Sequence, residues 1–452
     1  ISIRCGRGVG ARNKCGGGRG LRMALLFRAA RLRDRDDTHV FTFVVTRSAT
    51  REPDRDVTSK DFSAAHQRWA VAFSRHDSAL GLYLVWRDAS EGVHVYADFT
   101  FTLLSREHFS ANEGFSGSGV RFSAGGAAQG RGRCVSLGDL GARFLDARGE
   151  FQLELSMARV RTVVALVLRG PALQSAAVRF AGNEWQLSGT RDPPALRLER
   201  ANAAGGGARR CRVRFSLTVE GERSGALTQA ADGAAEWRPR TRLGSTPSAS
   251  LEFRWARPLE DVWLSAGRTA TCYDGERRAW ALRCDTHSDV VRLHMQYADV
   301  HHVPRNHLRY VSWSAWLLRA DAGEDEEAGA ELLPGAPFAH YYAQESADEG
   351  LMMETSLRVA ALGRPGPWVR AGGELRVRVE WRDSHLLFQA TYHVYDDLAR
   401  LHAHQLRREV AALQQENTAL ERQLVMYQRE LSRANEGPTP LARQHSTDTE
   451  YA

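Results

Sequence analysis

Lysine is almost absent from this chain, since Lys14 and Lys60 are the only two in 452 residues and arginine supplies nearly all the positive charge. Long apolar runs are also missing. No segment approaches the roughly 20 apolar residues of a membrane-spanning helix, so we predict no membrane span. The formal net charge is +7, but acidic residues occur in the same segments as the arginines. We therefore expect no single basic face, and nucleic acid is not a favoured partner.

Paired cysteines and glycosylation sites are lacking as well. The sequence contains no Cys-x-x-Cys pair and no Asn-x-Ser/Thr acceptor. The apolar segment that follows Met23 is too short for the core of a signal peptide. These features favour a reducing, cytoplasmic location. The six cysteines are scattered, at Cys5, Cys15, Cys134, Cys211, Cys272 and Cys284.

Catalytic signatures are absent too. There is no Gly-x-Ser-x-Gly elbow, no phosphate loop ending in Gly-Lys-Ser/Thr and no cysteine-protease signature, so we predict a non-catalytic protein without a cofactor. One region is rich in potential metal ligands, but it lacks the Cys-x-x-Cys or His-Glu-x-x-His spacing that a converging site uses, so no metal site is predicted. Its members are Cys272, Cys284, Asp285, His287, Asp289, His294, His301, His302 and His307.

The stretch Trp69–Leu104 carries the clearest structural pattern. Three short runs alternate apolar and polar residues, and turns containing Asp, Ser or Gly separate them, which is typical of strands with one buried face. Weaker copies of this order occur near Trp185 and Trp280. We therefore predict a mainly β protein built from antiparallel β-sandwiches. The residues expected in the core of the first sandwich are Trp69, Leu82, Leu84, Phe99 and Phe101.

Between residues 39 and 160 the order of these runs resembles that of a MATH domain, the meprin and TRAF homology sandwich. The usual Trp-Gly of that family is missing, and a Gly/Ser-rich segment that ends near Arg133, expected to be a loop, takes its place. The segments that carry the resemblance are VFTFVV from Val40, Trp69-Ala-Val-Ala-Phe, Leu80-Gly-Leu-Tyr-Leu, Val95-Tyr-Ala-Asp-Phe-Thr-Phe-Thr-Leu-Leu, Val135-Ser-Leu-Gly-Asp-Leu and Gly149-Glu-Phe-Gln-Leu-Glu-Leu-Ser-Met.

The resemblance and its copies imply tandem MATH/TRAF-like antiparallel sandwiches followed by an α-helical coiled coil. The closing strand of each unit runs directly into the next element. Both ends of the chain are polar or rich in Gly and Arg, so they are expected to be disordered. The predicted division is 1–37 disordered, 38–160 a MATH-like sandwich, 161–258 and 259–388 two divergent MATH-like sandwiches, 396–434 a coiled coil and 435–452 a disordered tail.

The segment 396–434 contains no Gly or Pro and has a heptad pattern. Leucine dominates one core position, and a single Asn417 interrupts the other. A buried asparagine at this position favours a parallel dimer at some cost in stability. TRAF-type adaptors, which the chain resembles, form trimers, and a helix packed on its own sandwich is a further alternative. The predicted oligomerisation residues are Leu406, Val410, Leu413, Asn417, Leu420, Leu424, Tyr427 and Leu431.

These features together predict a non-catalytic adaptor or scaffold. The sandwiches would bind protein or peptide segments along a strand edge, and the coiled coil would join chains into a homodimer or a trimer. The sequence does not identify the peptide-binding residues. The alternative is a dimeric RNA-associated protein whose Arg/Gly-rich N-terminus, residues 1–37, binds RNA.

Overall fold

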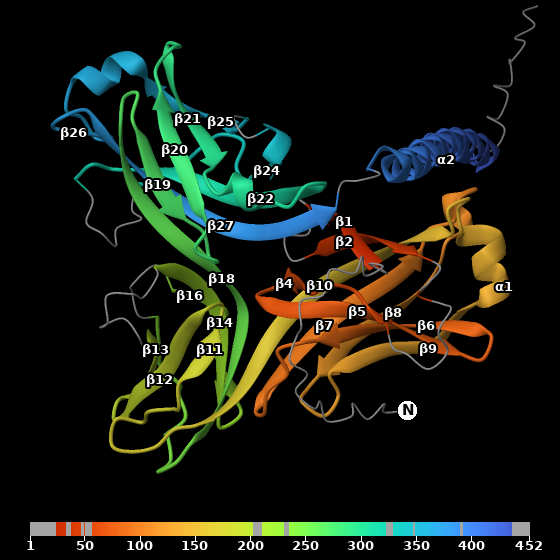
Figure 1. Cartoon of the computed structure of the whole chain (residues 1–452). Helices are drawn as coiled ribbons and strands as arrows, with labels where there is room; N and C mark the ends of the chain where they lie inside the picture. Colours follow the sequence, from red (N-terminus) through yellow and green to blue (C-terminus); the bar gives the residue numbers. More distant parts are fainter. Residues whose placement is uncertain are drawn as a thin grey trace, which may run out of the picture. The chain divides into compact units, whose positions relative to one another are not determined.

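The computed structural model describes residues 24–32, 38–46, 49, 57–201, 210–229, 235–321, 329–346, 349–388 and 392–435. The chain divides into two compact units. The β unit contains all the described strands, and the helix unit consists mainly of the C-terminal helix α2 (Tyr392–Asn435). Figure 1 shows the elements of both units.

The β unit contains one large sheet and three small ones, and every pairing between its strands is antiparallel. The large sheet has fourteen strands. They are β1 (Ala24–Arg31), β2 (His39–Thr46), β7 (Val93–Leu103), β8 (Glu113–Phe122), β10 (Glu150–Val167), β14 (Cys211–Val219), β15 (Glu222–Arg223), β16 (Leu227–Gln229), β18 (Ser248–Ser265), β22 (His307–Leu318), β23 (Glu331–Leu332), β24 (Phe338–Tyr342), β26 (Val369–Arg370) and β27 (Glu374–Phe388).

The small sheets come in chain order. The first contains β3 (Val57–Thr58), β4 (Phe62–Ala64), β5 (Gln67–His76), β6 (Ala79–Trp86) and β9 (Ala128–Ser136). The second contains β11 (Val178–Phe180), β12 (Asn183–Arg191), β13 (Pro194–Arg200) and β17 (Glu236–Trp237). The third contains β19 (Thr269–Tyr273), β20 (Ala279–Asp285), β21 (Val290–Tyr297) and β25 (Leu351–Arg358). The short helical turns are α1 (Leu137–Asp139), η2 (Phe109–Ala111), η3 (Leu140–Phe144), η5 (Val300–His302), η6 (Gln344–Ser346) and η7 (Val359–Gly363).

Three separate hydrophobic cores lie in the β unit, and each contains residues of one small sheet and of part of the large sheet. We call these parts the first, second and third lobes. Their cores span residues 24–160, 164–256 and 262–381, and Tyr310 and Leu387 of the third lobe also join the first core. The expected core residues of the first lobe are confirmed, because all five are buried. Alternation along the strands turns one face of each sheet toward its core.

Two long strands connect the lobes without a linker. The first part of β10 pairs with β2 and β7 of the first lobe, and its last six residues pair with β18 of the second. In the same way β18 pairs with β14 and then with β27 of the third lobe. The predicted boundaries after residues 160 and 258 therefore fall inside continuous strands. β10 bends where Arg159 has a φ of 50° and the pairing with β7 shifts register. Figure 1 shows β10, β18 and β27 as long curved ribbons.

A tryptophan turn occurs in the first two lobes with the same geometry. The indole Nε1 of Trp69 donates to the carbonyl of Ala64 at 3.1 Å, and that of Trp185 donates to the carbonyl of Phe180 at 3.1 Å. In both turns the two residues after the carbonyl-bearing residue are left-handed: Ala65 and His66 in the first, Ala181 and Gly182 in the second. The third lobe differs, because Trp280 donates to the carboxylate of Asp274 at 3.2 Å. The weak sequence copies near Trp185 and Trp280 therefore mark buried turns of related design.

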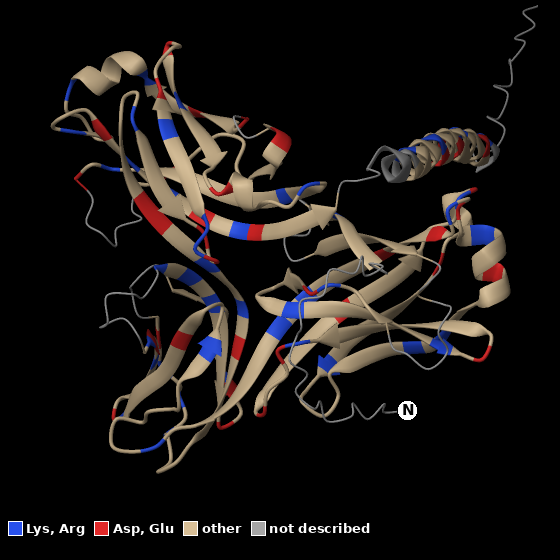
Figure 2. Cartoon of the chain, in the orientation of Figure 1, with Lys and Arg blue, Asp and Glu red and all other residues tan. Residues whose placement is uncertain are grey.

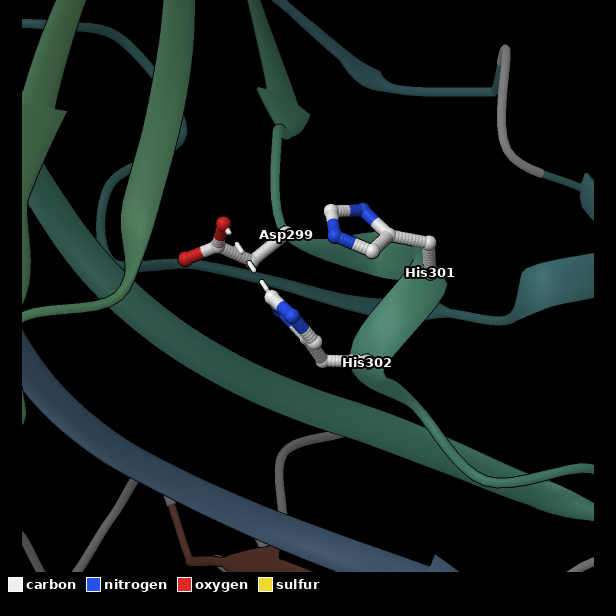
Figure 3. Close-up of side chains that lie close together, drawn as sticks. All are labelled: Asp299, His301 and His302. Atoms are coloured by element: carbon white, nitrogen blue, oxygen red, sulfur yellow. Dashed lines mark ion pairs between the residues drawn. The ribbon is translucent and has the colours of Figure 1, made fainter.

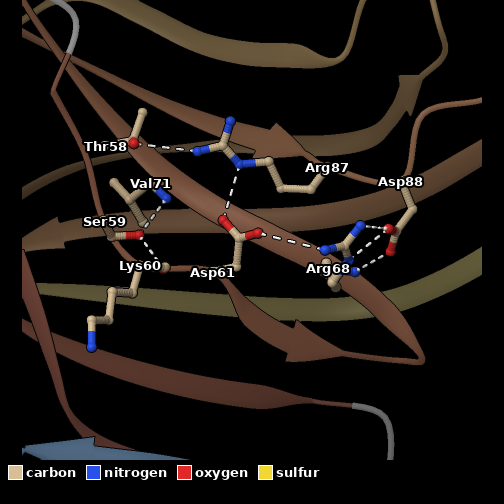
Figure 4. Close-up of polar contacts among 8 residues, drawn as sticks. All are labelled: Thr58, Ser59, Lys60, Asp61, Arg68, Val71, Arg87 and Asp88. Atoms are coloured by element: carbon tan, nitrogen blue, oxygen red, sulfur yellow. Dashed lines mark hydrogen bonds and ion pairs between the residues drawn. The ribbon is translucent and has the colours of Figure 1, made fainter. Parts of the chain in front are cut away.

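A serine accompanies the turn in the first two lobes. Ser59 Oγ accepts the backbone N–H of Val71 at 3.0 Å, and Ser175 Oγ accepts that of Leu187 at 3.0 Å. Each hydroxyl also donates to the carbonyl of the next residue at 2.8 Å. These bonds satisfy buried backbone groups at the strand edge, where an unpaired N–H would cost about 1–3 kcal/mol. Figure 4 shows the serine of the first lobe.

Two predictions about irregular segments need correction. Residues 24–31 lie in the range expected to be disordered, but they form β1, which pairs with β2 and buries Phe27. The apolar residues that follow Met23 explain this strand. The Gly/Ser-rich segment expected to be a loop contains β8 and β9, whose glycines allow close packing of strands. Residues 1–23, 33–37 and 436–452 lie outside the described residues.

Ionic networks join the second and third lobes. Asp261 accepts from Arg210 at 2.8 Å, from Arg376 at 2.9 Å and from Arg378 at 2.7 Å. Close by, Glu380 accepts from two arginines of the second lobe, Arg212 at 2.9 Å and Arg257 at 2.8 Å. Buried carboxylates need such partners to offset their lost hydration. These ion pairs account for part of the high arginine content of the chain.

Charges of both signs are interspersed along the strands of the β unit (Figure 2). No basic face stands out in that view of the described residues. None of the described helices is both long enough and apolar enough to cross a membrane.

Candidate functional site

The apolar stripe of α2 is the clearest candidate interaction site. Helix formation over 396–434 is confirmed, since α2 spans Tyr392–Asn435. The seven apolar residues of the predicted heptad core are between 45% and 64% exposed, and Asn417 is exposed as well. They recur every three or four residues, which places them along one side of a helix. The structure thus brings all eight predicted oligomerisation residues onto one accessible stripe of a single helix.

The stripe is unusual for its size. Most large apolar side chains of the β unit are buried, whereas the stripe exposes leucines along several helical turns. An isolated amphipathic helix in water gains little stability from its own backbone, because most helical stability in proteins comes from packing of the apolar face. A stripe of this length is therefore suited to contact with another apolar surface, and the heptad spacing fits a second helix best.

Potential metal ligands converge at one turn (Figure 3). Asp299, His301 and His302 place one ligand atom each within 4.8 Å of one another. Asp299 Oδ1 lies 3.8 Å from His302 Nδ1, and its Oδ2 accepts the backbone N–H of Ala279 at 2.7 Å. The set offers three of the four ligands of a tetrahedral zinc site.

That turn lacks the support which metal sites usually have. Both imidazoles are exposed. Apart from the contact of His302 with Asp299, no hydrogen bond from either ring to a carboxylate or carbonyl is found among the described residues, although second-shell partners of this kind normally orient ligating histidines. Of the region that the sequence marked as rich in ligands, the structure brings together only this histidine pair, and it adds Asp299. We assign no function to the turn.

The cysteines of the described part are poorly suited to nucleophilic chemistry. Burial raises the pKa of Cys134 and of Cys284 to about 11, and that of Cys211 to about 12. The pKa of Cys272 is also raised, mainly by burial. The reactive form of cysteine is the thiolate, so these side chains remain protonated near neutral pH.

A polar cluster covers the outer face of the first lobe (Figure 4). Arg68 pairs with Asp88 at 2.7 Å, and Arg87 pairs with Asp61 at 3.1 Å and donates to Thr58 at 3.2 Å. The side chains are partly or largely exposed, and solvent weakens such pairs to about 0–1 kcal/mol. The alternating charges satisfy each other, so this surface has the character of a solvated sheet face.

A buried polar centre lies where the three lobes meet. Asp383 of β27 accepts from Arg31 at 3.1 Å and from the hydroxyl of Ser312 at 3.1 Å, and it lies 3.8 Å from His39 Nδ1. His66 of the first lobe accepts the backbone N–H of Ala256 of the second lobe at 3.0 Å. These bonds link residues that are far apart in the sequence.

Burial shifts the protonation of this centre. It lowers the pKa of His66 and of His385 to about 4, with the charge of Asp383 acting in the opposite direction. Burial alone would raise the pKa of Asp383, but His39 and Arg31 hold it far below its usual range. At neutral pH the centre therefore contains two neutral imidazoles and an ionised carboxylate.

Sequence reasoning missed this centre. Its members lie near residues 31–66 and near 383–385, and no local spacing indicates that they meet. The only available signal is weak: charged residues interrupt the apolar alternation of β27 at Asp383 and His385.

No protein-family model matches the chain, and no curated protein matches it in sequence. The resemblance to MATH domains therefore remains a prediction from the order of the segments.

Proposed function

We propose that this protein is a non-catalytic adaptor or scaffold that oligomerises through α2 and binds segments of other proteins through its β unit. The exposed heptad stripe of α2 is the observation that carries the proposal. In this proposal the three lobes are tandem sandwiches of the MATH/TRAF-like type, and the helix forms a parallel homodimer because Asn417 occupies a core position of the heptad.

An exposed strand edge supports the binding half of the proposal. Among the described strands β8 pairs only with β7, and most of its residues are exposed or half-buried. A strand with one free edge presents unpaired backbone N–H and C=O groups, to which an extended peptide can add by β-augmentation. The alternating side chains of such a strand would supply specificity.

Oligomerisation would strengthen such binding. A single added strand is a small contact, but two β units joined by a helix pair bind a bivalent partner at a high effective concentration, which raises the overall affinity without a new contact. The proposed role of the helix is therefore to multiply a weak binding unit.

The test uses the full chain and two matched double variants. Leu413→Glu with Leu420→Glu places charges in the stripe, whereas Gln415→Glu with Thr418→Glu places two charges on positions outside the heptad core. We expect the wild type and the second variant to be dimers by size-exclusion chromatography with light scattering, and the first variant to be a monomer. A trimer would retain the adaptor proposal but correct its stoichiometry.

The same proteins then test binding. We expect pull-downs from cell extract to recover the same partners with the wild type and the control variant, and much less with the stripe variant. A monomeric wild type, or equal recovery with all three proteins, would refute the role of the helix.

A further inference from the structure

Two adjoining cavities open at the meeting point of the lobes, with volumes of about 300 Å³ and about 230 Å³. They share lining residues, among them Glu276 and Ser384. The larger one contains residues from all three lobes, including His66, Trp255 and Trp381. Its size is at the lower end of the range for small-molecule sites.

Three hydrogen-bond donors on one face of the β22–β27 ribbon lack partners in the described structure. They are Nε1 of Trp381, Oγ of Ser384 and Nε of Arg309, and each atom is buried. The Trp381 side chain lines the larger cavity, although the residue is only 4% exposed. Ser384 lines both cavities and Arg309 lines the smaller one.

The strand register places these donors together. Trp381 pairs with Trp313, and Ser384 pairs with Val311, two residues from Arg309 along β22. Directly paired residues and residues two apart share a face in an antiparallel sheet, and the register shift after Ser312 keeps Trp381 on that face. On the opposite face of these strands Ser312 donates to Asp383.

An indole N–H and a guanidinium can only donate hydrogen bonds, so a ligand here has to offer acceptors. A buried donor without a partner costs about 1–3 kcal/mol, and native proteins contain few of them. Arg309 and Ser384 line the same smaller cavity, so their two unpaired donors indicate a place where acceptor atoms bind.

Charge narrows the class of ligand. The described residues place no carboxylate in ion-pair contact with Arg309, and burial together with the nearby Arg278 lowers its pKa. The neighbouring carboxylates are already engaged, because Arg278 pairs with Asp274 at 2.7 Å and with Glu276 at 2.6 Å. Asp274 also accepts from the indole of Trp280. Arg309 is thus a partly buried cation that makes no direct ion pair with a described carboxylate, although the more distant charges of Glu276 and Asp274 act on it.

From these contacts we infer that the smaller cavity, beside β22 and β27, binds a small oxyanion, a carboxylate or a phosphate group, through Arg309 and Ser384. The guanidinium supplies the charge, and the hydroxyl donates to a second oxygen. Because residues of the first and third lobes line this cavity, the bound anion stabilises their junction. The inference does not depend on the proposed adaptor function.

The test measures thermal stability and binding of the full chain with three probes at matched ionic strength: inorganic phosphate, succinate and chloride. We expect a saturable rise in the melting temperature, and heat of binding, with phosphate or succinate but not with chloride. A response to phosphate alone identifies a phosphate site, and a response to succinate alone identifies a carboxylate site. No saturable response to either probe would overturn the inference.

Variants locate the site. Arg309→Met should weaken the responding anion about 10- to 100-fold, since hydrogen bonds to charged groups contribute most. The melting temperature without anion should be unchanged or higher, because an unpaired charge is removed. Arg292→Met changes an exposed arginine of the same lobe, paired with Glu354, and should leave binding intact.

Ser384→Ala removes the hydroxyl with the smallest change in volume and should weaken binding while the fold is retained. Trp381→Phe removes the indole donor at the larger cavity and should leave binding unchanged. If Arg309→Met fails to fold, Ser384→Ala still tests whether the anion binds in the smaller cavity. Unchanged affinity in the folded Arg309→Met and Ser384→Ala variants would show that the anion binds elsewhere.

Discussion

Large apolar side chains are mostly buried in the β unit but exposed on α2. Trp69 and Phe101 of the first lobe are fully buried, whereas Leu413 and Leu424 of the helix are each 59% exposed. The sheets of the β unit cover each other within one chain, whereas the stripe of α2 is left exposed by the residues that the structure describes. The β unit should therefore be stable at any protein concentration, while the stability of the helix should depend on a second surface.

Charged residues show a related contrast within the β unit. The carboxylate of Glu380 is almost completely buried between two arginines, whereas Glu354 pairs with Arg292 on the surface. Burial makes the first pairing costly to break, and solvent makes the second nearly neutral. Ion pairs at the lobe junction and at the surface thus have different roles despite similar distances.

The largest expected effect comes from breaking a lobe core. Trp69→Ala removes a fully buried indole and its bond to Ala64, and should lower the free energy of unfolding of the β unit by about 3–5 kcal/mol. Urea denaturation measures the loss. Tyr273→Ala, at a residue that is 48% exposed, is the control and should change little. Similar losses in both variants would contradict the assigned core.

The second-largest loss of stability is expected at the ion pairs of Glu380, which join the second and third lobes. Glu380→Gln removes the carboxylate charge that pairs with Arg212 and Arg257 and should cost about 3 kcal/mol. Glu354→Gln at the surface should cost less than about 1 kcal/mol. The comparison of the two melting temperatures tests whether the junction network holds the second and third lobes together. Equal shifts would argue against that role.

Acid should destabilise the β unit through His385 at the junction of the lobes. The pKa of His385 is lowered to about 4 in the folded protein, against an ordinary value near 6.5. Between these values the unfolded chain binds more protons than the folded one, so stability falls as the pH is lowered from about 6.5 to about 4. The loss for this histidine is at most about 3 kcal/mol.

His385→Phe provides the control, because it keeps the aromatic contacts with Phe41 and Tyr310. Its unfolding free energy should vary less over the same pH range, measured by denaturation at several pH values. A variant with the pH dependence of the wild type would exclude His385 as a contributor.

The smallest expected change in stability is that of the oligomer formed by α2. Asn417→Leu replaces the polar residue of the stripe and should stabilise the oligomer by about 1 kcal/mol, the lower end of the cost of burying an amide. It should also relax the preference for a dimer. Light scattering and concentration-dependent helix melting measure both effects. No change in either would mean that Asn417 does not face a partner chain.

The sequence predicted much of the β fold because alternation is a local property. The run around Trp69, the strand that follows His39 and the helix after residue 391 are readable from the spacing of apolar residues. The strands β8 and β9 were missed because glycine and serine hide the alternation, and β1 was missed because arginine-rich flanks suggested disorder. Both segments form strands because a neighbouring strand pairs with them.

The composition and spacing of this sequence by themselves determined many of the strands, though not β1, β8 or β9, and one helix with an apolar stripe, and they marked three tryptophan-centred repeats. Those features depend on residues within a few positions of one another. Only the tertiary structure decided that β10 and β18 run unbroken from lobe to lobe, and that Arg31 meets Asp383. It alone also placed Arg309, Ser384 and Trp381 on one face. Contacts of this kind depend on strand register and long-range pairing, which no local pattern contains.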